Sequence, residues 1–280
     1  MCGEEASGEV TSERPRRGDR WRVVAASVPG TRHQKRQQPC QDAHYWATVQ
    51  NDVLVAAVAD GASSATLGKV GATLAVCAAA TTVGVHHQRT VCPDNDEAWC
   101  QWLVDALHAA HATVVAEAQA RQVPVRELAT TLILVVAMPA RVAVAQIGDG
   151  AVVVSDMAGN LLALTVPQKG AYPNETTFLI SPNALTAAQV GVWRGSPKHV
   201  VAFSDGLQRL ALQMPDGHPH APFFFPFFQL VETVPAAREA QGQVEAFLGS
   251  QRVRDRTDDD VTLFIGSLIR SSGDAGPMSL

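Results

Sequence analysis

The sequence predicts an α+β fold in which two packed, mostly antiparallel β-sheets are flanked by helices. Three observations support this prediction. Short Val-rich runs, separated by turn residues, fill residues 129–166. Two long Ala-rich segments of helical character precede these runs, and a helical segment and a strand-like run close the chain. Short connections make neighbouring strands antiparallel, and helices before and after them favour stacked layers of helix and sheet.

The first elements are two strand regions and two helices. Strand-like runs cover 21–28 and 45–59, the latter broken by an Asn-Asp turn signal. The almost uncharged, Ala-rich segment 64–87 predicts a helix packed closely on a sheet. A second helix is predicted at 94–121, because acidic residues fill its first turn and Arg121 ends it, which complements the helix dipole.

The middle of the chain predicts an antiparallel meander. Its four runs are joined by tight turns at Pro139-Ala140, Asp149-Gly150 and 158–160. A strand, a helix start and a loop are expected next, and the loop includes the Phe-rich stretch 223–228. This stretch either packs beneath the loop or forms part of a lid or partner surface. A helix at 236–251 and a strand at 261–269 complete the chain.

One domain is expected to span residues 20–272, because no linker or internal repeat divides the chain. Residues 1–19 are polar and predict a disordered lead-in, and 273–280 predict a flexible tail.

Composition restricts the class of protein. The chain of 280 residues is 46% hydrophobic and 18% charged, which is ordinary for a soluble globular protein. Its net charge of −5 argues against a general nucleic-acid binder. We find no charge-free apolar stretch of roughly 20 residues that would span a bilayer, and the start lacks the apolar centre of a signal peptide. We therefore expect a cytoplasmic protein that binds neither membranes nor nucleic acid.

Carboxylates stand at the ends of several predicted strands. Three apolar runs finish on an Asp-Gly pair, at Asp60-Gly61, Asp149-Gly150 and Asp205-Gly206. Asp42 and the triplet 258–260 instead precede strand-like runs. A fourth pair, Asp216-Gly217, follows no apolar run and predicts a plain turn. Carboxylates at so many strand termini indicate a site built at one edge of a sheet.

Clustered carboxylates repel one another, and their pKa values rise unless a cation lies among them. Oxygen ligands without an accompanying Cys or His cluster favour magnesium or manganese over zinc. The pattern therefore predicts a site for a hard divalent metal ion.

In their order along the chain, these motifs resemble those of the metal-dependent protein phosphatases of type 2C, especially bacterial members. The resemblance covers roughly residues 21–270 and rests on "CQDAHYW", "VAAVADGASSA", "TTLILVV" followed by "AQIGDGAVVV", "NETTF", "VVAFSDGLQRLAL" and "DDDVTLFIG". It implies an α-β-β-α sandwich with two Mn2+ or Mg2+ ions, and in many relatives a third, at one end of the sheets.

The resemblance also implies roles for individual residues. Asp60, the carbonyl group of Gly61, Asp205 and Asp259 would bind metal. Asp42 would lie close behind them and hydrogen-bond metal-bound water. Asp149 would help to hold the third, weaker ion. The predicted catalytic residues are Asp42, Asp60 and Asp205, and the predicted metal-site residues are Asp42, Asp60, Gly61, Asp149, Asp205 and Asp259. Two ions close together would lower the pKa of a shared water toward neutrality.

Three positions depart from the family's pattern. Ala62 stands where eukaryotic relatives carry a His that protonates the leaving group. Gln41 stands where a Glu often precedes the Asp at position 42. The usual Arg for the substrate phosphate is not at its expected spacing, and His33 or Arg36 could replace it, unless both are solvated loop charges.

The predicted function is therefore a serine/threonine protein phosphatase that opposes a bacterial kinase. Two alternatives stay open: a degenerate phosphatase fold that binds metal or a phosphorylated partner without turnover, and a phosphatase of small metabolites. The complete set of metal-ligand positions favours an enzyme.

Overall fold

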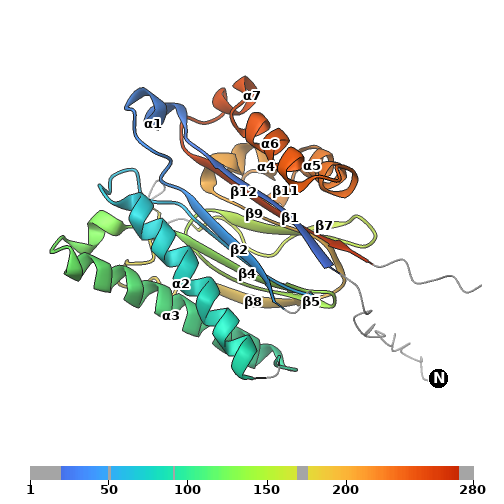
Figure 1. Cartoon of the computed structure of the whole chain (residues 1–280), viewed down its shortest axis with the longest axis horizontal. Coiled ribbons are helices and arrows are strands. Elements are labelled where there is room, and N and C mark those ends of the chain that lie inside the picture. The colour runs from blue at the N-terminus through green and yellow to red at the C-terminus, as the bar shows by residue number, and fades with distance from the viewer. Residues whose placement is uncertain (1–19, 50–51, 91, 169–175, 271–280) are drawn as a thin grey trace, which may run out of the picture.

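A computed structural model describes residues 20–49, 52–90, 92–168 and 176–270. It has four layers, in which two β-sheets pack face to face and helices cover both outer faces (Figure 1). The predicted α-β-β-α sandwich is thus confirmed. The expectations for 1–19 and 273–280, and the start of the "NETTF" motif, lie outside the described residues.

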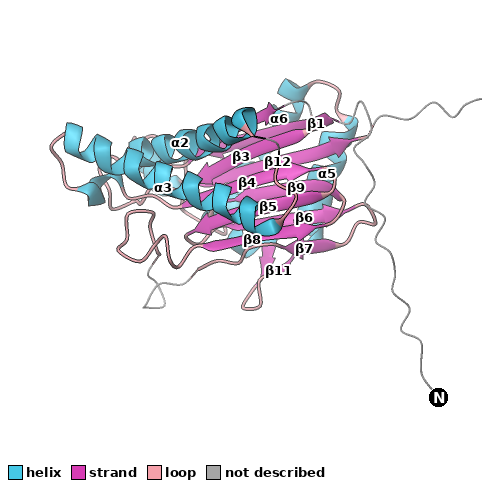
Figure 2. Ribbon diagram, turned by 90° about the horizontal axis from the view of Figure 1, so that it is seen from below, coloured by secondary structure: helices cyan, strands magenta, loops and turns pink. Residues whose placement is uncertain are grey.

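Each of the two main sheets has five strands (Figure 2). The first has the order β1-β12-β9-β6-β7, with bounds Arg20–Val28, Val261–Ile269, Pro197–Phe203, Ala151–Asp156 and Leu161–Ala163. The second has the order β2-β3-β4-β5-β8, with bounds Ala43–Val49, Val53–Ala59, Leu132–Met138, Arg141–Ile147 and Gln189–Arg194. Short strands β10 (Leu212–Gln213) and β11 (His218–Pro219) pair separately. All of these pairings are antiparallel.

The outer helices divide between the two sheets. Helices α2 (Gly68–Arg89) and α3 (Asp96–Ala120) cover the second sheet. Helices α5 (Ala221–Thr233) and α6 (Ala237–Leu248) cover the first. The remaining helices are short: α1 (Thr31–Lys35), α4 (Gln208–Ala211), α7 (Gln251–Arg254), and the 3-10 turns Val125–Leu128 and Asp205–Leu207.

Three hydrophobic cores hold the four layers together. One lies between the sheets, and each of the others lies between a sheet and its helices. In β12, Leu263 and Ile265 face α5 and α6, whereas Phe264 and Leu268 face the other sheet. Because both faces of the central strands are buried, their sequences are almost continuously apolar although their pairing is antiparallel.

The predicted meander is wrong at one connection. β4 and β5 form the expected hairpin, but β6 lies in the other sheet, so that the turn at Asp149-Gly150 joins the two sheets. A tight turn and a change of sheet have the same sequence signal, because both sheets need equally apolar strands. The strand β8 was also not predicted.

The Phe-rich stretch is a helix, and the predicted loop is therefore wrong. Pro222 lies in the first turn of α5, where no helical N–H is required, but Pro226 lies inside the helix. An interior proline costs about 3 kcal/mol. Burial of each Phe side chain contributes about 1.5–3 kcal/mol, and Phe223, Phe224, Phe227 and Phe228 are all buried. Packing, the first of the two alternatives, therefore explains most of this stretch.

Helix α2 is the one helix in the described part of the chain that is long and apolar enough to cross a bilayer by length and composition. The composition predicted no segment able to span a bilayer, and this finding corrects that prediction. The helix nevertheless packs one face on the second sheet and on α3, with Ala72, Ala75, Val76, Ala79 and Val83 buried. It has the position of a core helix in a globular domain.

Candidate active site

The antiparallel registers bring the predicted acidic positions to one edge of the sandwich. In the second sheet, Ala43 at the start of β2 pairs with Ala59 at the end of β3. Leu132 at the start of β4 likewise pairs with Ile147 at the end of β5. Strands that begin at this edge therefore alternate with strands that end at it.

The first sheet repeats this arrangement. Phe203 at the end of β9 pairs with Leu263 near the start of β12 and with Ala151 at the start of β6. The turn at Asp149-Gly150 joins the same edges of the two sheets. Asp42, Asp60, Asp149, Asp205 and the triplet 258–260 thus gather at this edge, as their strand-terminal positions predict.

Asp60 leaves the fully buried strand β3, and its backbone is fixed by two threonines. Its N–H donates to Thr131 Oγ1 at 2.9 Å, and its carbonyl oxygen accepts from the N–H of Thr131 at 2.9 Å and from Thr130 Oγ1 at 3.0 Å. A Cβ built on Gly61 would lie 2.5 Å from the carbonyl carbon of Gly68. Close backbone packing therefore requires glycine after this aspartate.

Asp205 follows β9 and begins the 3-10 turn Asp205–Leu207. A Cβ on Gly206 would lie 2.2 Å from the carbonyl oxygen of Asp260, so this glycine too is required by close approach. The control pair behaves differently, because Gly217 has a φ of +71° in an ordinary turn. The two kinds of Asp-Gly pair thus have different physical causes.

The carboxylates of Asp60 and Asp205 are in direct contact. Burial, with the charges of Asp42 and Asp205, raises the pKa of Asp60 well above its ordinary value. Burial and the charge of Asp149 raise the pKa of Asp205 to about 6. Two carboxylates held this close repel one another when both are ionised, so the arrangement favours a cation between them.

Asp42 is completely buried beneath this pair. Its Oδ2 accepts hydrogen bonds of 2.7 Å from Ser204 Oγ and from Thr262 Oγ1. Burial raises the pKa of Asp42 to about 7, and these two hydrogen bonds oppose the rise. The carboxylate is therefore oriented by two hydroxyl groups of the first sheet's edge, one directly after β9 and one in β12.

The three consecutive aspartates before β12 have three different environments. Asp258 is exposed and forms a 3.1 Å ion pair with Arg32. Asp259 is half-buried, and both it and Asp258 line the cavity at the sheet edge. Asp260 is buried and clamps three segments, because it accepts from the N–H of Gly30 at 2.7 Å, from His33 Nδ1 at 2.8 Å and from the N–H of Gln41 at 2.5 Å. Asp260 is thus committed to structural hydrogen bonds, whereas Asp258 and Asp259 face the cavity and pair with Arg32.

The cavity has a volume of about 630 Å³. Asp149, Asp205 and Asp259 line it, together with Arg209 and Arg256. Burial raises the pKa of Asp149, although a 2.6 Å hydrogen bond from Thr176 Oγ1 opposes the rise. Three of the predicted metal ligands therefore face one common space.

The residues present fit a hard divalent cation. The buried oxygens Asp42 Oδ1 and Asp205 Oδ1 have no hydrogen-bond partner in the described part of the structure. Within the same ranges, no three His, Cys, Asp or Glu side chains lie close enough to enclose an ion unaided. Pairs of carboxylates completed by water molecules are the kind of site that Mg2+ occupies, because it keeps several of its waters.

The structure gives His33 a structural contact, and its predicted role in phosphate binding stays a prediction. It is 2% exposed, and its Nδ1 is engaged by the buried Asp260. Arg36, the alternative, ends helix α1 at the surface and forms no ion pair with the acidic residues of the described ranges.

Arg32, which the sequence analysis did not single out, is paired with the carboxylates of the acidic edge. Its guanidinium group lies 3.1 Å from Asp258, 3.6 Å from Asp259 and 3.3 Å from Ser63 Oγ. Nearby acidic groups raise the pKa of Arg32, with Asp258 and Asp259 contributing most. Arg32 is one of several basic residues in a short stretch, so composition and spacing could not select it.

The sequence analysis also missed two positioning residues, Ser204 and Thr262. It named Gln41 without a specific role. Gln41 Oε1 accepts a 2.8 Å hydrogen bond from the N–H of Lys69 in the first turn of α2. The amide that replaces the usual Glu thus anchors this helix to the site. No local pattern marks these residues, because their partners are 28 to 220 residues away.

Comparisons with known proteins agree with this geometry. Residues 29–249 match the family model described as "Protein phosphatase 2C". A relative from Escherichia coli (strain K12), "Serine/threonine-protein phosphatase 3", is 38% identical over 252 residues, covering 87% of this chain and 96% of the relative.

Solved structures with the same fold include two bacterial-type phosphatases. The S. agalactiae serine/threonine phosphatase has a TM-score of 0.61 and 15% identity, covering 89% of this chain and 100% of that one. The catalytic domain of PstP, in complex with 2 manganese ions, has a TM-score of 0.58 and 16% identity, covering 90% and 99%. The family match and the E. coli relative confirm the resemblance seen in the motifs: this chain belongs to the protein phosphatase 2C family and is a phosphoprotein phosphatase.

Proposed function

We propose that this phosphatase hydrolyses phosphoserine and phosphothreonine in proteins, using water activated by two divalent metal ions at the acidic edge of the sandwich. One observation carries the proposal: Asp60 and Asp205 hold their carboxylates in contact, and a buried oxygen of Asp205 lacks a partner. Such a pair needs a divalent cation to stay ionised. The specificity for serine and threonine is supported by the name of the E. coli relative.

Asp60, the carbonyl group of Gly61, Asp205 and Asp259 would hold the two ions, with Asp149 at the edge of the same cavity for a third. Mn2+ or Mg2+ suits these oxygen ligands, and the PstP structure contains manganese. When bound, such ions supply an activated water at neutral pH and neutralise charge on the phosphoryl oxygens.

The chain's own residues would position the reactants. Asp42, fixed by Ser204 and Thr262, presents its unpartnered Oδ1 as an acceptor for a water proton. Arg32 stands beside Asp259 and offers a guanidinium group for a phosphate. Ala62 provides no acid for the leaving group, so we expect phosphates with good leaving groups to react fastest.

We further propose that the enzyme acts in the cytoplasm and opposes a serine/threonine kinase. The kinase partner is supported by the phosphoprotein substrate that the family implies.

The test is hydrolysis of para-nitrophenyl phosphate and of a phosphothreonine peptide with manganese, with magnesium and with a chelator. Wild type is compared with Asp205→Asn and with Asp216→Asn, which changes the Asp-Gly pair of the ordinary turn. We expect metal-dependent turnover that Asp205→Asn reduces at least roughly 100-fold and Asp216→Asn leaves unchanged. Calorimetric titration with Mn2+ should show weaker binding to Asp205→Asn alone.

Three results would overturn the proposal. Metal binding to folded wild type without turnover would indicate the non-catalytic module. Efficient hydrolysis of small phosphate esters combined with rejection of the peptide would indicate a metabolite phosphatase. Full activity with chelator would exclude the metal mechanism.

A further inference from the structure

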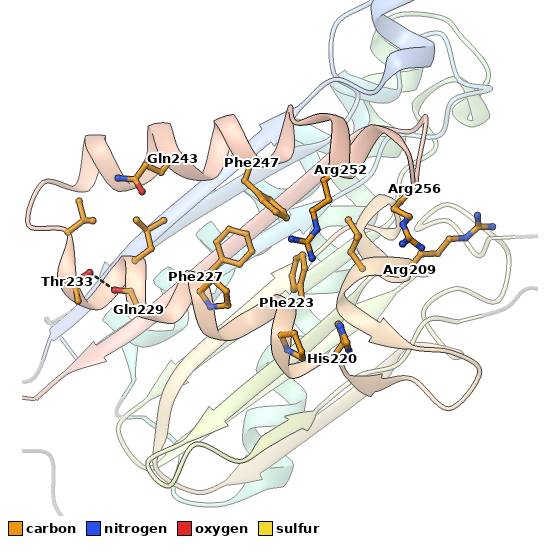
Figure 3. Close-up of a pocket in the computed structure, with 15 residues that line it drawn as sticks. Arg209, His220, Phe223, Phe227, Gln229, Thr233, Gln243, Phe247, Arg252 and Arg256 are labelled. Carbon is orange, nitrogen blue, oxygen red and sulfur yellow. Dashed lines mark hydrogen bonds between the residues drawn. The ribbon is translucent and has the colours of Figure 1, made fainter.

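A second cavity lies beside the acidic edge, on the face covered by α5 and α6. It has a volume of about 730 Å³ and opens between α5, α6 and α7 (Figure 3). This volume is in the range of specific binding pockets. We call it the α5–α6 groove and define it by Arg209, His220, Phe223, Phe227, Phe247, Arg252 and Arg256, which line it together with neighbouring residues.

The floor of the groove is aromatic. Phe223 contacts Phe227 with ring centroids 5.3 Å apart, and Phe247 of α6 lies 5.0 Å from Phe227 and 6.2 Å from Phe223. Phe223 and Phe227 each keep 7% of their surface exposed, on the side that lines the groove. Such a cluster of ring edges accommodates an aromatic or large aliphatic side chain.

One end of the groove is strongly basic. Figure 3 shows Arg209 and Arg256 at this end and Arg252 between them and the phenylalanines, beside Phe223, with His220 below. All three arginines are exposed, and no carboxylate in the described ranges forms an ion pair with any of them. In a chain of net charge −5, this local excess of positive charge favours an acidic ligand.

The groove is continuous with the candidate active site. Arg209 and Arg256 line both cavities, and Asp205 and Asp259 lie on the other side of these two arginines. A polypeptide whose phosphorylated residue lies at Asp205 would therefore cross the arginines before it reaches the phenylalanines. The order along such a ligand would be phosphate, then acidic residues, then an apolar anchor.

We propose that the α5–α6 groove binds the segment that flanks the phosphorylated residue in the protein substrate. Acidic side chains of this segment contact Arg209, Arg252 and Arg256, and an aromatic or large aliphatic side chain packs on Phe223, Phe227 and Phe247. The inference rests on the proposed function, since it assigns a substrate class to the same site. The groove selects acidic-apolar flanks, whereas the metal site acts on the phosphate alone.

The experiment compares phosphothreonine peptides that differ only in a distal flank. One set carries Glu-Asp followed by Phe-Leu after a short Gly-Ser spacer, on either side of the phosphothreonine, and the other carries Ser-Ala repeats in these places. Values of kcat/KM are divided by the value for para-nitrophenyl phosphate, which is too small to reach the groove. The enzymes are wild type, Arg252→Glu and the matched control Arg254→Glu, because Arg254 is an exposed arginine of α7 that does not line the groove.

We expect the kcat/KM of wild type to be roughly tenfold higher for one acidic-apolar peptide than for the matching Ser-Ala peptide, because its KM is lower. Arg252→Glu should abolish this preference and Arg254→Glu should keep it. Replacing the Phe of the peptide by Ala should lower the preference in wild type but have no effect in Arg252→Glu. Equal kcat/KM for both flanks in wild type, or equal losses in the two variants, would refute the proposal.

A separate readout distinguishes failure of the groove from failure of the proposed function. If wild type with metal hydrolyses nothing, the catalytic proposal fails, and the groove is tested by fluorescence anisotropy with a labelled, unphosphorylated acidic-apolar peptide. Binding that Arg252→Glu weakens and Arg254→Glu retains supports the groove, and absence of binding refutes it. A wild-type dimer that Arg252→Glu dissociates would assign the groove to a second copy of the chain instead.

Discussion

The carboxylate of Asp42 accepts a 2.7 Å hydrogen bond from the hydroxyl group of Thr262, which lies 220 residues further along the chain. Asp42 directly precedes β2 in one sheet, and Thr262 belongs to β12 in the other. The same hydroxyl lies 2.7 Å from Ser27 Oγ in β1. This contact therefore connects the two sheets directly beneath the candidate metal centre.

Thr262→Val should destabilise the protein and weaken catalysis together. The substitution keeps the side-chain shape but removes a buried donor to a charged acceptor, which costs about 2 kcal/mol. Urea unfolding measures the stability, and hydrolysis of para-nitrophenyl phosphate with Mn2+ measures the activity. Thr262→Ser retains the hydroxyl and should recover most of both. Equal stability and activity of Thr262→Val and wild type would show that the hydrogen bond does not orient Asp42.

Arg32→Ala should impair phosphate binding, whereas Arg36→Ala should not. Arg32 lies among Ser63, Asp258 and Asp259, whereas Arg36 is an exposed residue at the end of α1 with no ion pair in the described ranges. We expect Arg32→Ala to raise both the KM for a phosphopeptide and the inhibition constant of inorganic phosphate by roughly tenfold. Equal effects of the two substitutions would indicate a general electrostatic contribution rather than a contact with the phosphate.

The three adjacent aspartates should respond differently to the same change to asparagine. Asp260→Asn should reduce stability by about 3 kcal/mol, because a buried carboxylate loses charged hydrogen bonds to three segments. Asp258→Asn should cost less than about 1 kcal/mol, since it breaks only a surface ion pair. Asp259→Asn should retain stability but weaken Mn2+ binding in calorimetric titrations. Loss of metal affinity in Asp258→Asn and not in Asp259→Asn would contradict this assignment.

His199 should make the stability of the fold depend on pH. Its Nδ1 lies 2.8 Å from Ser267 Oγ, its Nε2 lies 3.1 Å from Glu232, and its ring stacks on Phe228. Burial lowers the pKa of His199 from 6.5 to about 4; the charge of Glu232 opposes this shift, and that of Lys198 adds to it. The unfolded chain therefore binds more protons between these two values, and stability is lost as pH falls through this window.

From about pH 7 to about pH 5, this loss should amount to about 2 kcal/mol. Urea unfolding at both pH values, on wild type and on His199→Gln, isolates the contribution, because the variant has no imidazole to protonate. The decrease in unfolding free energy should be smaller in the variant by this amount. Parallel decreases in the two proteins would mean that other groups cause the acid sensitivity.

Much of the architecture could be predicted from local sequence. The closing strand occupies 261–269 as expected. The ends of the two long helices lie within two residues of the predicted ends, except that α2 begins a few residues later than predicted. These elements are predictable because their apolar runs and helix-end residues depend on near neighbours. The same information could not show that β5 and β6 belong to different sheets. It also did not predict α5, because the burial of four Phe side chains offsets the free-energy cost of the proline inside this helix.

The sequence by itself determined that aspartates stand at strand ends, and the antiparallel order of the strands requires such positions to meet at one edge. Only the tertiary structure decided the role of each polar residue there. It placed Asp258 and Asp259 at the cavity while burying Asp260, and it placed Arg32 beside Asp259 while burying His33 against Asp260. The physical reason is that backbone periodicity is encoded locally, whereas burial and hydrogen bonding are set by partners far away in the chain.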